Sequence, residues 1–313
     1  MTSLNNIKPP ISVVMPVFNG EKYIDEAIRS ILDQTFTDFE FIIIDDCSTD
    51  RTAEKVLQHK DTRIQFLRND KNVGNYPARN RGYEIARGKY ICVMDADDIS
   101  DRDRLRIQFQ FMEFNEEVGI CGSFIKNIPS GIVPRFITDY ELLKVAFLSN
   151  NFCSHPSLIL RKEFMERDKL KYNAEFRYSA DFDLCVQGLK HFKICNIPDV
   201  LLKYRRHPEQ ISWEKAREQE YFADIIRINQ LEEIFGFNTE EIPILLHLKL
   251  MKRLPVSVRY KYKAEQWIEA LLNRNRLIGY YQDTILKQFL FNTLNLCLNQ
   301  NLVNIRIQKE TVN

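Results

Sequence analysis

The 313-residue sequence lacks any Cys-x-x-Cys pair, and its seven cysteines lie far apart along the chain. An odd number of scattered cysteines indicates neither a disulfide framework nor a zinc ribbon. A reducing cytoplasm is therefore the compartment that fits the sequence best.

Long apolar runs are also missing. No stretch reaches the roughly 18 consecutive apolar residues that a membrane-spanning helix needs, and residues 1–10 do not resemble a signal peptide. We therefore expect a cytoplasmic protein, whose contact with the inner face of the cell membrane could only be peripheral.

Excess charge and glycine-rich loops are absent too. The net charge is +1, so nothing steers the whole molecule toward nucleic acid, and we expect no nucleic-acid partner. The ten glycines form no Gly-x-Gly and no Gly-x-x-x-x-Gly-Lys. This argues against a dinucleotide-binding dehydrogenase and against a P-loop enzyme.

What the sequence does contain is an apolar stretch, residues 90–94, that ends in three carboxylates, Asp95, Asp97 and Asp98. Acids that follow a buried strand lie at the carboxyl edge of a sheet, where open α/β folds bind ligands. Because three like charges repel one another, a hard cation such as Mg²⁺ or Mn²⁺ is their natural partner. The alternative is a solvated acidic turn that caps the next helix.

Strand-like and helix-like segments alternate around this stretch, which predicts a mostly parallel sheet flanked by helices. Beyond Asp98 the alternation becomes weaker, with a Gly/Pro-containing loop at residues 127–134, and from residue 213 the pattern is helical. The expected strands are residues 11–15, 39–44, 64–67, 90–94, 118–124 and 157–160, and the expected helices include residues 74–86, 101–113, 181–189, 213–235 and most of 244–299.

Several short motifs occur in an order typical of one enzyme family. They are ISVVMPVFN at 11–19, SILDQTF at 30–36, IDDCSTD at 44–50, NVG at 72–74, ARNRG at 78–82 and DAD at 95–97. In this order they resemble family 2 glycosyltransferases of the GT-A fold, of the bacterial type that builds cell-surface polysaccharide or lipopolysaccharide. The resemblance covers about residues 10–212.

The resemblance implies a domain organisation. Residues 1–212 would form the GT-A catalytic domain, with a nucleotide-sugar half at about 10–100 and an acceptor half at about 101–212. Residues 213–313 would form a helical C-terminal region.

The resemblance also implies a role for each donor-side position. Pro16, Val17, Phe18 and Asn19 would hold the nucleotide base, and Asp46 would bind the uracil edge. From the residues alone, Phe18 could equally be a core aromatic, and Asp46 a helix cap. Further along the chain, Arg79 would contact nucleotide or phosphate, Asp95 the ribose or metal-bound water, and Asp97 the divalent ion, Mn²⁺ or Mg²⁺. Taken by itself, an Arg on a predicted helix is more often a solvated side chain.

On the acceptor side, residues 172–184 resemble the motif in which a Glu-Asp pair opens a helix and the Asp acts as general base. This implies that Asp181 is the base, with Asp183 as the fallback. The sequence departs from the motif at the Glu position, which Ala180 occupies. The alternative is that both aspartates only charge a helix N-terminus.

Residues 204–212 resemble the loop that closes over the diphosphate. The resemblance implies that His207 is a third metal ligand and that Arg205 or Arg206 contacts phosphate. His155 resembles a recurrent acceptor-side element, for which packing is the simpler interpretation.

Together these features imply a metal-dependent, inverting hexosyl- or N-acetylhexosaminyltransferase. It would move a sugar from a nucleotide-sugar, most simply a UDP-sugar, to a hydroxyl of a growing or lipid-linked glycan. Two alternatives stay open: a catalytically inactive nucleotide-sugar-binding scaffold, and a sugar-1-phosphate nucleotidyltransferase.

The C-terminal region contains a locally basic stretch. Residues 249–276 carry eight Lys or Arg and two Glu, interleaved with Leu, Tyr and Trp. This composition suits an anionic membrane surface, and it equally suits an amphipathic helix that packs with a solvated basic face.

Overall fold

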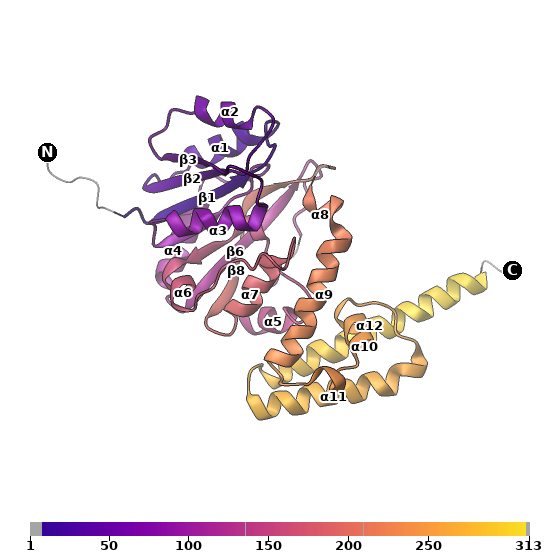
Figure 1. The fold of residues 1–313 in the computed structure, drawn as a ribbon. Coiled ribbons are helices and arrows are strands. Elements are labelled where there is room, and N and C mark those ends of the chain that lie inside the picture. Colours follow the sequence, from indigo (N-terminus) through magenta and orange to yellow (C-terminus); the bar gives the residue numbers. More distant parts are fainter. Residues whose placement is uncertain (1–7, 135, 209, 311–313) are drawn as a thin grey trace. The chain divides into compact units, whose positions relative to one another are not determined.

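The computed structural model describes residues 8–134, 136–208 and 210–310 (Figure 1). Most of the N-terminal stretch considered above, residues 1–7, lies outside the described residues. The chain forms two compact units, which are described separately. The first comprises residues 1–138 and 153–216, and the second comprises residues 139–152 and 217–313.

The first unit is built on an eight-stranded sheet in the order β3-β2-β1-β4-β7-β6-β8-β5. Neighbouring strands from β3 to β4 are parallel, as are β6 and β8, whereas β7 is antiparallel to both β4 and β6. The strands are β1 (Ile11–Val17), β2 (Phe39–Asp45), β3 (Ile64–Arg68), β4 (Tyr90–Val93), β5 (Ile99–Ser100), β6 (Val118–Ile128), β7 (Ile159–Arg161) and β8 (Lys193–Arg205).

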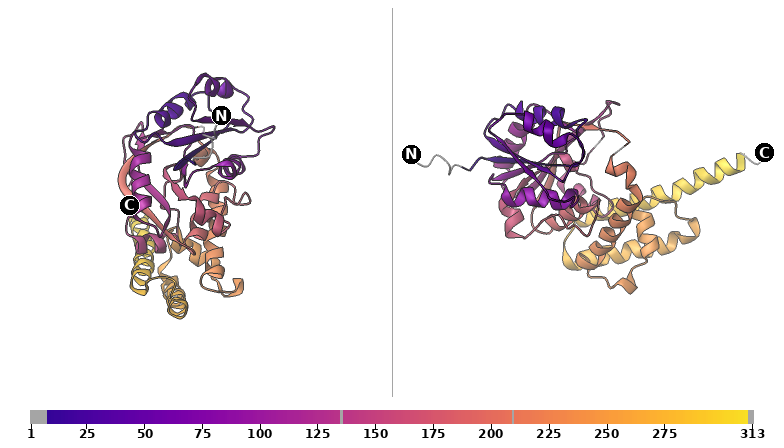
Figure 2. Two further views of the ribbon diagram at one scale, coloured as in Figure 1. Left: turned by 90° about the vertical axis from the view of Figure 1, so that its left-hand side faces the viewer. Right: turned by 45° about the horizontal axis from the view of Figure 1, so that its top comes forward.

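Helices cover both faces of this sheet, as the two views of Figure 2 show. The helices of the first unit are α1 (Ile24–Leu32), α2 (Thr52–Gln58), α3 (Asn75–Ile85), α4 (Arg104–Phe114), η1 (His155–Ser157), α6 (Lys162–Arg167), α7 (Ala180–Gly188) and α8 (Ile211–Glu214). The prediction of a mostly parallel sheet flanked by helices is confirmed.

Strand β1 shows why central strands of the sheet are buried along their whole length and are mostly apolar. All seven of its residues are buried, because alternate side chains point to opposite faces and each face is covered. Val13 and Met15 belong to the core that contains α1, whereas Val14 belongs to the core beneath α3. Gly82 of α3 allows this close approach, since a Cβ there would lie 2.4 Å from a γ-methyl of Val14.

The second unit is helical in its described part. It contains α5 (Tyr140–Ala146), α9 (Ala216–Glu233), η2 (Thr239–Glu241), α10 (Ile244–Met251), η3 (Val258–Tyr260), α11 (Lys261–Ile278) and α12 (Asp283–Glu310). The basic stretch therefore spans the end of α10, η3 and nearly all of α11. Among the described residues, none of the helices combines the length and apolarity required to span a bilayer.

Candidate active site

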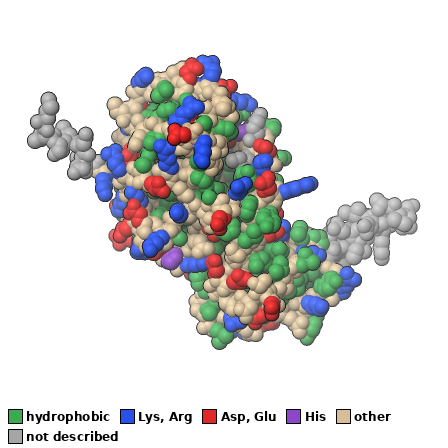
Figure 3. Space-filling model, viewed as in Figure 1, with side chains coloured by type: hydrophobic (Ala, Val, Ile, Leu, Met, Phe, Trp, Pro, Cys, Tyr) green, Lys and Arg blue, Asp and Glu red, His purple; other side chains and the backbone are tan. Residues whose placement is uncertain are grey.

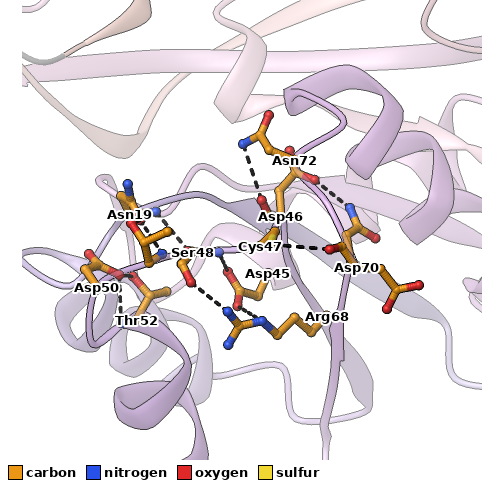
Figure 4. A network of polar contacts seen from close by, with 12 residues as sticks. Asn19, Asp45, Asp46, Cys47, Ser48, Asp50, Thr52, Arg68, Asp70 and Asn72 are labelled. Atoms are coloured by element: carbon orange, nitrogen blue, oxygen red, sulfur yellow. Dashed lines mark hydrogen bonds and ion pairs between the residues drawn. The ribbon is translucent and has the colours of Figure 1, made fainter.

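The loops that follow β1 and β2 are bonded to each other (Figure 4). The backbone N–H of Asn19 donates to Ser48 Oγ at 2.9 Å, and Asn19 Oδ1 accepts from the N–H of Thr49 at 2.8 Å. The guanidinium of Arg68 donates to the carbonyl of Ser48 at 2.7 Å. These bonds fix the predicted base-binding loop against its neighbour.

Both loops contain a left-handed residue that is not glycine. Asn19 has φ 52° and Cys47 has φ 67°. Such conformations are uncommon outside glycine and concentrate at functional sites. The bonds between the loops hold this geometry in place.

The predicted base-binding residues divide into two pairs. Pro16 and Val17 are buried within β1, and the carbonyl of Val17 accepts from the N–H of Asp46 at 2.7 Å. Phe18 is 50% exposed, so the alternative that it is a core aromatic is wrong. Its ring and Asn19 are the members of this group that face solvent.

Asp46 is 2% exposed and organises the turn that leads into α3. Its carboxylate accepts from Asn69 Nδ2 at 2.6 Å and from the backbone N–H groups of Val73 and Gly74 at 3.0 and 2.8 Å. Its side chain is therefore directed to this turn and not to the N-terminus of α2. The contact of Asp46 with a nucleotide base stays a prediction.

The carboxylates that follow β4 form a cluster. One ligand oxygen each from Asp95, Asp97 and Asp98 lies within 4.8 Å of the others. Asp98 is fully buried, and its Oδ2 has no hydrogen-bond partner in the described part of the chain. Carboxylate oxygens are the ligands that Mg²⁺ and Mn²⁺ prefer, so the residues present fit such an ion.

Burial raises the pKa of the Asp97 carboxyl, and the neighbouring charge of Asp95 raises it further. The pKa of Asp98 lies well above its usual range, first because of burial and then because of Asp97 and Asp95. A divalent cation would relieve both effects by neutralising the repulsion.

The C-terminal end of β8 and the residues that follow it close onto this cluster. His207 Nε2 lies 2.9 Å from Asp97 Oδ2, and its ring packs against Tyr23 at 5.0 Å between centroids. The backbone N–H of Arg205 donates to Asp98 Oδ1 at 2.8 Å, and its Nε donates to the carbonyl of Asp97 at 2.7 Å. The predicted metal ligands Asp97 and His207 are thus in direct contact.

The two arginines of this segment differ in environment. The guanidinium of Arg205 lies over the ring of Tyr23 at 4.6 Å and pairs with Glu26 of α1. Arg206 is exposed and lies over the ring of Tyr204 at 5.2 Å. Of the two, Arg206 has the side chain that faces solvent, whereas Arg205 fastens the segment to α1.

Arg79 is fully buried, so the alternative that it is a solvated helix side chain is wrong. Its guanidinium pairs with Asp95 Oδ1 at 2.5 Å and donates to the carbonyls of Val14 and Met94 at 3.4 and 3.3 Å. These contacts favour a role in holding Asp95 over direct contact with phosphate.

The predicted general base, Asp181, lies at the start of α7. Asp181 is half-buried, and its Oδ1 accepts a hydrogen bond from the phenol of Tyr76 at 2.8 Å. Ala180 is fully buried, and Asp183 is 7% exposed. Asp181 is therefore the more accessible of the two aspartates, as their spacing on a helix predicts.

A buried aromatic cluster adjoins Asp181. His155 Nε2 lies 2.8 Å from the phenol oxygen of Tyr172, which in turn lies 2.9 Å from that of Tyr83. Burial, followed by the charge of Arg79, lowers the pKa of His155 to about 4, so its imidazole is neutral at pH 7. The packing interpretation of His155 agrees with these contacts.

Helix α3 connects the predicted site acids to one another. The turn before it binds Asp46, Tyr76 in its first turn binds Asp181, and Arg79 one turn later binds Asp95. The helix thus contacts acids that follow β2 and β4 and one that opens α7.

Sequence reasoning missed Tyr76, Tyr23 and Glu26 as members of this site. One usable signal existed for Tyr76, since residues three apart on a helix share a face and Arg79 was already a candidate. Tyr23 and Glu26 gave no signal, because their partner Arg205 lies 179 residues beyond Glu26.

Solved structures with the same architecture are glycosyltransferases. The chain matches S. aureus TarS (residues 1–349) in complex with UDP-GlcNAc at a TM-score of 0.57 and 18% identity, over 93% of this chain and 89% of that one. It matches the mannosyltransferase PcManGT of Pyrobaculum calidifontis, in complex with GDP-Man and Mn²⁺, at 0.57 and 14% identity, over 93% and 88%. The fold is therefore the GT-A fold.

Sequence relatives define the family. The model for glycosyl transferase family 2 matches residues 12–170. An uncharacterized glycosyltransferase of Methanocaldococcus jannaschii is 37% identical over 208 residues, which cover 63% of this chain and 71% of that protein. The Escherichia coli UDP-Glc:alpha-D-GlcNAc-diphosphoundecaprenol beta-1,3-glucosyltransferase WfgD is 28% identical over 218 residues, covering 69% and 85%. The chain belongs to glycosyl transferase family 2.

Proposed function

We propose that the chain is a metal-dependent, inverting glycosyltransferase that moves a hexosyl or N-acetylhexosaminyl group from a UDP-sugar to a hydroxyl of a glycan. The observation that carries this proposal is the set of contacts from α3 to Asp46, Asp95 and Asp181. One rigid element thereby links the predicted donor side to the predicted base.

In this proposal Asp181 accepts the proton of the acceptor hydroxyl. The hydroxyl oxygen bonds to the anomeric carbon while the bond from that carbon to the diphosphate oxygen breaks, with inversion. Help of this kind contributes roughly 10²–10⁴-fold to a rate. Asp181 suits the role because it is only half-buried and is already oriented by a phenol.

Asp97 and His207 would hold Mn²⁺ or Mg²⁺, and Asp95 would face the ribose or metal-bound water. When bound, the ion would neutralise the charge that grows on the departing nucleoside diphosphate. Arg206 would contact phosphate, Arg205 would keep the closing segment on the acids, and the exposed ring of Phe18 would pack on the base.

The UDP donor is supported by findings on two other proteins. The E. coli relative is named for a UDP-glucose donor, and TarS has been solved with UDP-GlcNAc. Thermal unfolding with Mn²⁺ and a panel of UDP-, GDP- and dTDP-sugars tests this assignment, because a ligand bound by the native state raises its apparent stability. We expect UDP-sugars to raise Tm; a shift with GDP- or dTDP-sugars alone would overturn it.

A second candidate, an inactive nucleotide-sugar-binding scaffold, is favoured by one observation. Ala180 occupies the position where the family motif has Glu, and it is fully buried. Release of UDP from a bound UDP-sugar separates the two candidates, since transferases transfer slowly to water in the absence of acceptor. We expect Mn²⁺-dependent release of UDP, and binding without any release would support the scaffold. Membership of glycosyl transferase family 2 disfavours the nucleotidyltransferase.

For the acceptor we propose a lipid-linked glycan at the inner face of the cell membrane, reached through residues 253–263, the basic-aromatic segment. This segment has four cationic residues and no carboxylate. Val258 and Tyr262 are 57% and 71% exposed, while Trp267 and Leu271 further along α11 are buried. In Figure 3 hydrophobic and cationic side chains lie side by side on the visible face of the second unit.

Co-sedimentation with phosphatidylglycerol vesicles at low salt tests the membrane proposal. Reversing two cations, Lys261→Glu with Lys263→Glu, should weaken binding at least about 30-fold, since each cation near an anionic surface contributes about 1 kcal/mol. The matched pair Lys60→Glu with Lys126→Glu, at exposed positions in the first unit, should bind like the wild type. Absence of vesicle binding by the wild type would favour simple packing of the helices.

A further inference from the structure

Tyr76 forms the side-chain contact that joins α3 to the predicted base. Its phenol donates to Asp181 Oδ1 at 2.8 Å, across 105 residues of sequence. Its ring stacks on Tyr172 at 5.1 Å between centroids and meets His155 edge-on at 6.1 Å. The ring is therefore held from two sides, and the hydroxyl is directed by packing.

The phenol acts only as a donor in this contact. Burial raises the pKa of Tyr76 well above its usual value, and the charge of Asp181 raises it further. A tyrosine that keeps its proton cannot exchange roles with the carboxylate, so Tyr76 is not itself a base. Its effect must pass through Asp181.

We propose that Tyr76 is a positioning residue for the proposed base: it fixes one carboxylate oxygen of Asp181 and stabilises the ionised form. This inference rests on the proposed function of Asp181. The residue before Asp181, Ala180, has no polar atom in its side chain, so α7 supplies no neighbouring carboxyl at that position. The phenol from α3 supplies an orienting contact there instead.

The position of Tyr76 on α3 gives this contact a second consequence. The same helix holds Asp95 through Arg79, and the turn before it holds Asp46. A base tied to this helix keeps its place relative to the donor-side acids. Reaction rates are sensitive to such placement, because an error of about 1 Å costs on the order of 100-fold.

Other titratable groups lie near Asp181, and a test of the Tyr76 contact must leave these residues unchanged. They are His155 from η1, Cys153 from the segment before it, and Asp183 and Cys185 from α7 itself.

The variant Tyr76→Phe removes the hydroxyl and keeps the ring. NMR spectra are recorded on full-length protein labelled with ¹³C at the aspartate carboxyls. The Asp181 resonance is identified as the one that is missing from the spectrum of Asp181→Asn. A hydrogen bond donated to a carboxylate favours its charged form. We therefore expect this resonance to titrate at higher pH in Tyr76→Phe than in the wild type. An unchanged midpoint would overturn the inference, whatever the substrate of the enzyme.

Tyr83→Phe is the matched control, since Tyr83 lies on the same helix and in the same aromatic cluster, and its hydroxyl bonds Tyr172. Its Asp181 midpoint should equal that of the wild type. If Tyr76→Phe does not fold, Tyr76→Met tests the same point with a flexible apolar side chain. An equal shift in Tyr83→Phe would show a general packing effect and would also overturn the inference.

Turnover of the UDP-sugar selected by thermal unfolding gives a second readout. We expect kcat of Tyr76→Phe to fall about 10- to 100-fold with an unchanged KM for the donor, and the acidic limb of the kcat profile to move to higher pH. If Asp181→Asn retains activity, the proposed function of Asp181 fails. If Asp181→Asn is inactive while Tyr76→Phe resembles the wild type in kcat and profile, only the role of Tyr76 fails.

Discussion

At the scale of single residues, the acid cluster brings together carboxyls whose charged forms are disfavoured by burial and by one another. Asp97 and Asp98 both have raised carboxyl pKa values, chiefly because burial disfavours the charged form. His207 offsets part of this for Asp97 by a contact of 2.9 Å. The proposed cation would neutralise the charge that His207 offsets only in part.

Replacing Asp97 tests this interpretation. In calorimetric titration, Asp97→Ala should lose the part of the UDP affinity that depends on Mn²⁺, because the carboxylate that pairs with His207 is gone. The control Asp168→Ala removes a carboxylate that pairs with the surface residue Arg167, and it should leave the titration unchanged. An Mn²⁺-dependent gain that persists in Asp97→Ala would rule out this residue as a metal ligand.

Replacing Asp181 separates chemistry from binding. Asp181→Asn keeps the size of the side chain and can still accept the phenol hydrogen bond of Tyr76, but it cannot take a proton from an acceptor. We expect turnover to fall roughly 10²–10⁴-fold while the donor affinity measured by calorimetry stays within about twofold. Near-normal turnover would mean that Asp181 is not the general base, and Asp183 would be the next residue to replace.

The acids and the closing segment were predictable because each follows a recognisable stretch of sequence. Asp95 and Asp97 directly follow an apolar strand, and His207 lies in a short motif. The role of Arg79 was harder to predict, because its burial depends on carbonyl groups of β1 and β4 that no local pattern reveals. A buried guanidinium that holds a carboxylate looks, in sequence, like any helical arginine.

At the scale of elements, the strands that carry a local apolar run were predicted, whereas β5 and β8 were missed. Strands β1, β2 and β4 are buried at every residue, since helices cover both their faces. Strand β8 (Lys193–Arg205) was missed, because Pro198 and Asp199 interrupt its pattern and three consecutive residues there are exposed. Irregular pairing with β6 accommodates this interruption, and only the assembled sheet shows it.

The close packing of α3 on the sheet gives a prediction about stability. In an exposed helix, Gly→Ala stabilises by about 1 kcal/mol. At Gly82 we expect the opposite sign, a loss of about 1–3 kcal/mol in the free energy of unfolding, because the new methyl would lie 2.4 Å from a γ-methyl of Val14. Urea unfolding of the purified variant measures this loss.

The double variant is the control for the Gly82 prediction. Val14→Ala removes the γ-methyl that Gly82→Ala would meet, so the two changes together should cost less than the sum of the separate changes. If the losses in the free energy of unfolding were additive, the contact between α3 and β1 would not limit the size of residue 82. The expected non-additivity would show that α3, and with it Tyr76 and Arg79, is held at a fixed distance from the sheet.

At the scale of the whole molecule, each unit contains a buried histidine that is neutral in the folded state. In acid, this histidine takes up a proton when the chain unfolds. In the first unit this is His155, and in the second unit it is His247, whose pKa burial and the charge of Arg227 lower to about 3. His247 is 1% exposed, and its Nδ1 accepts from the indole of Trp267 at 3.2 Å. As the pH is lowered, each histidine binds a proton near pH 6.5 in the unfolded chain, and only at a lower pH in the folded protein.

The sign of the effect follows from this difference. A group whose pKa is lower in the folded state makes stability fall as pH decreases below the unfolded value, here from about 6.5 toward about 3 for His247. In the first unit the raised pKa values of Asp97 and Asp98 act in the opposite direction, since these carboxyls bind protons more readily when folded. The second unit therefore gives the clearer measurement.

Tryptophan fluorescence reports on the second unit, because Trp267 is buried against His247 whereas Trp213 is 64% exposed. Between pH 8 and pH 5, we expect the free energy of unfolding that this probe measures to fall by about 2 kcal/mol more in the wild type than in His247→Gln. Glutamine keeps an acceptor for the indole and has no proton to gain. The variant His191→Gln, at an exposed imidazole of the first unit, should follow the wild type. Parallel pH curves for the wild type and His247→Gln would mean that the unfolding unit does not protonate this histidine.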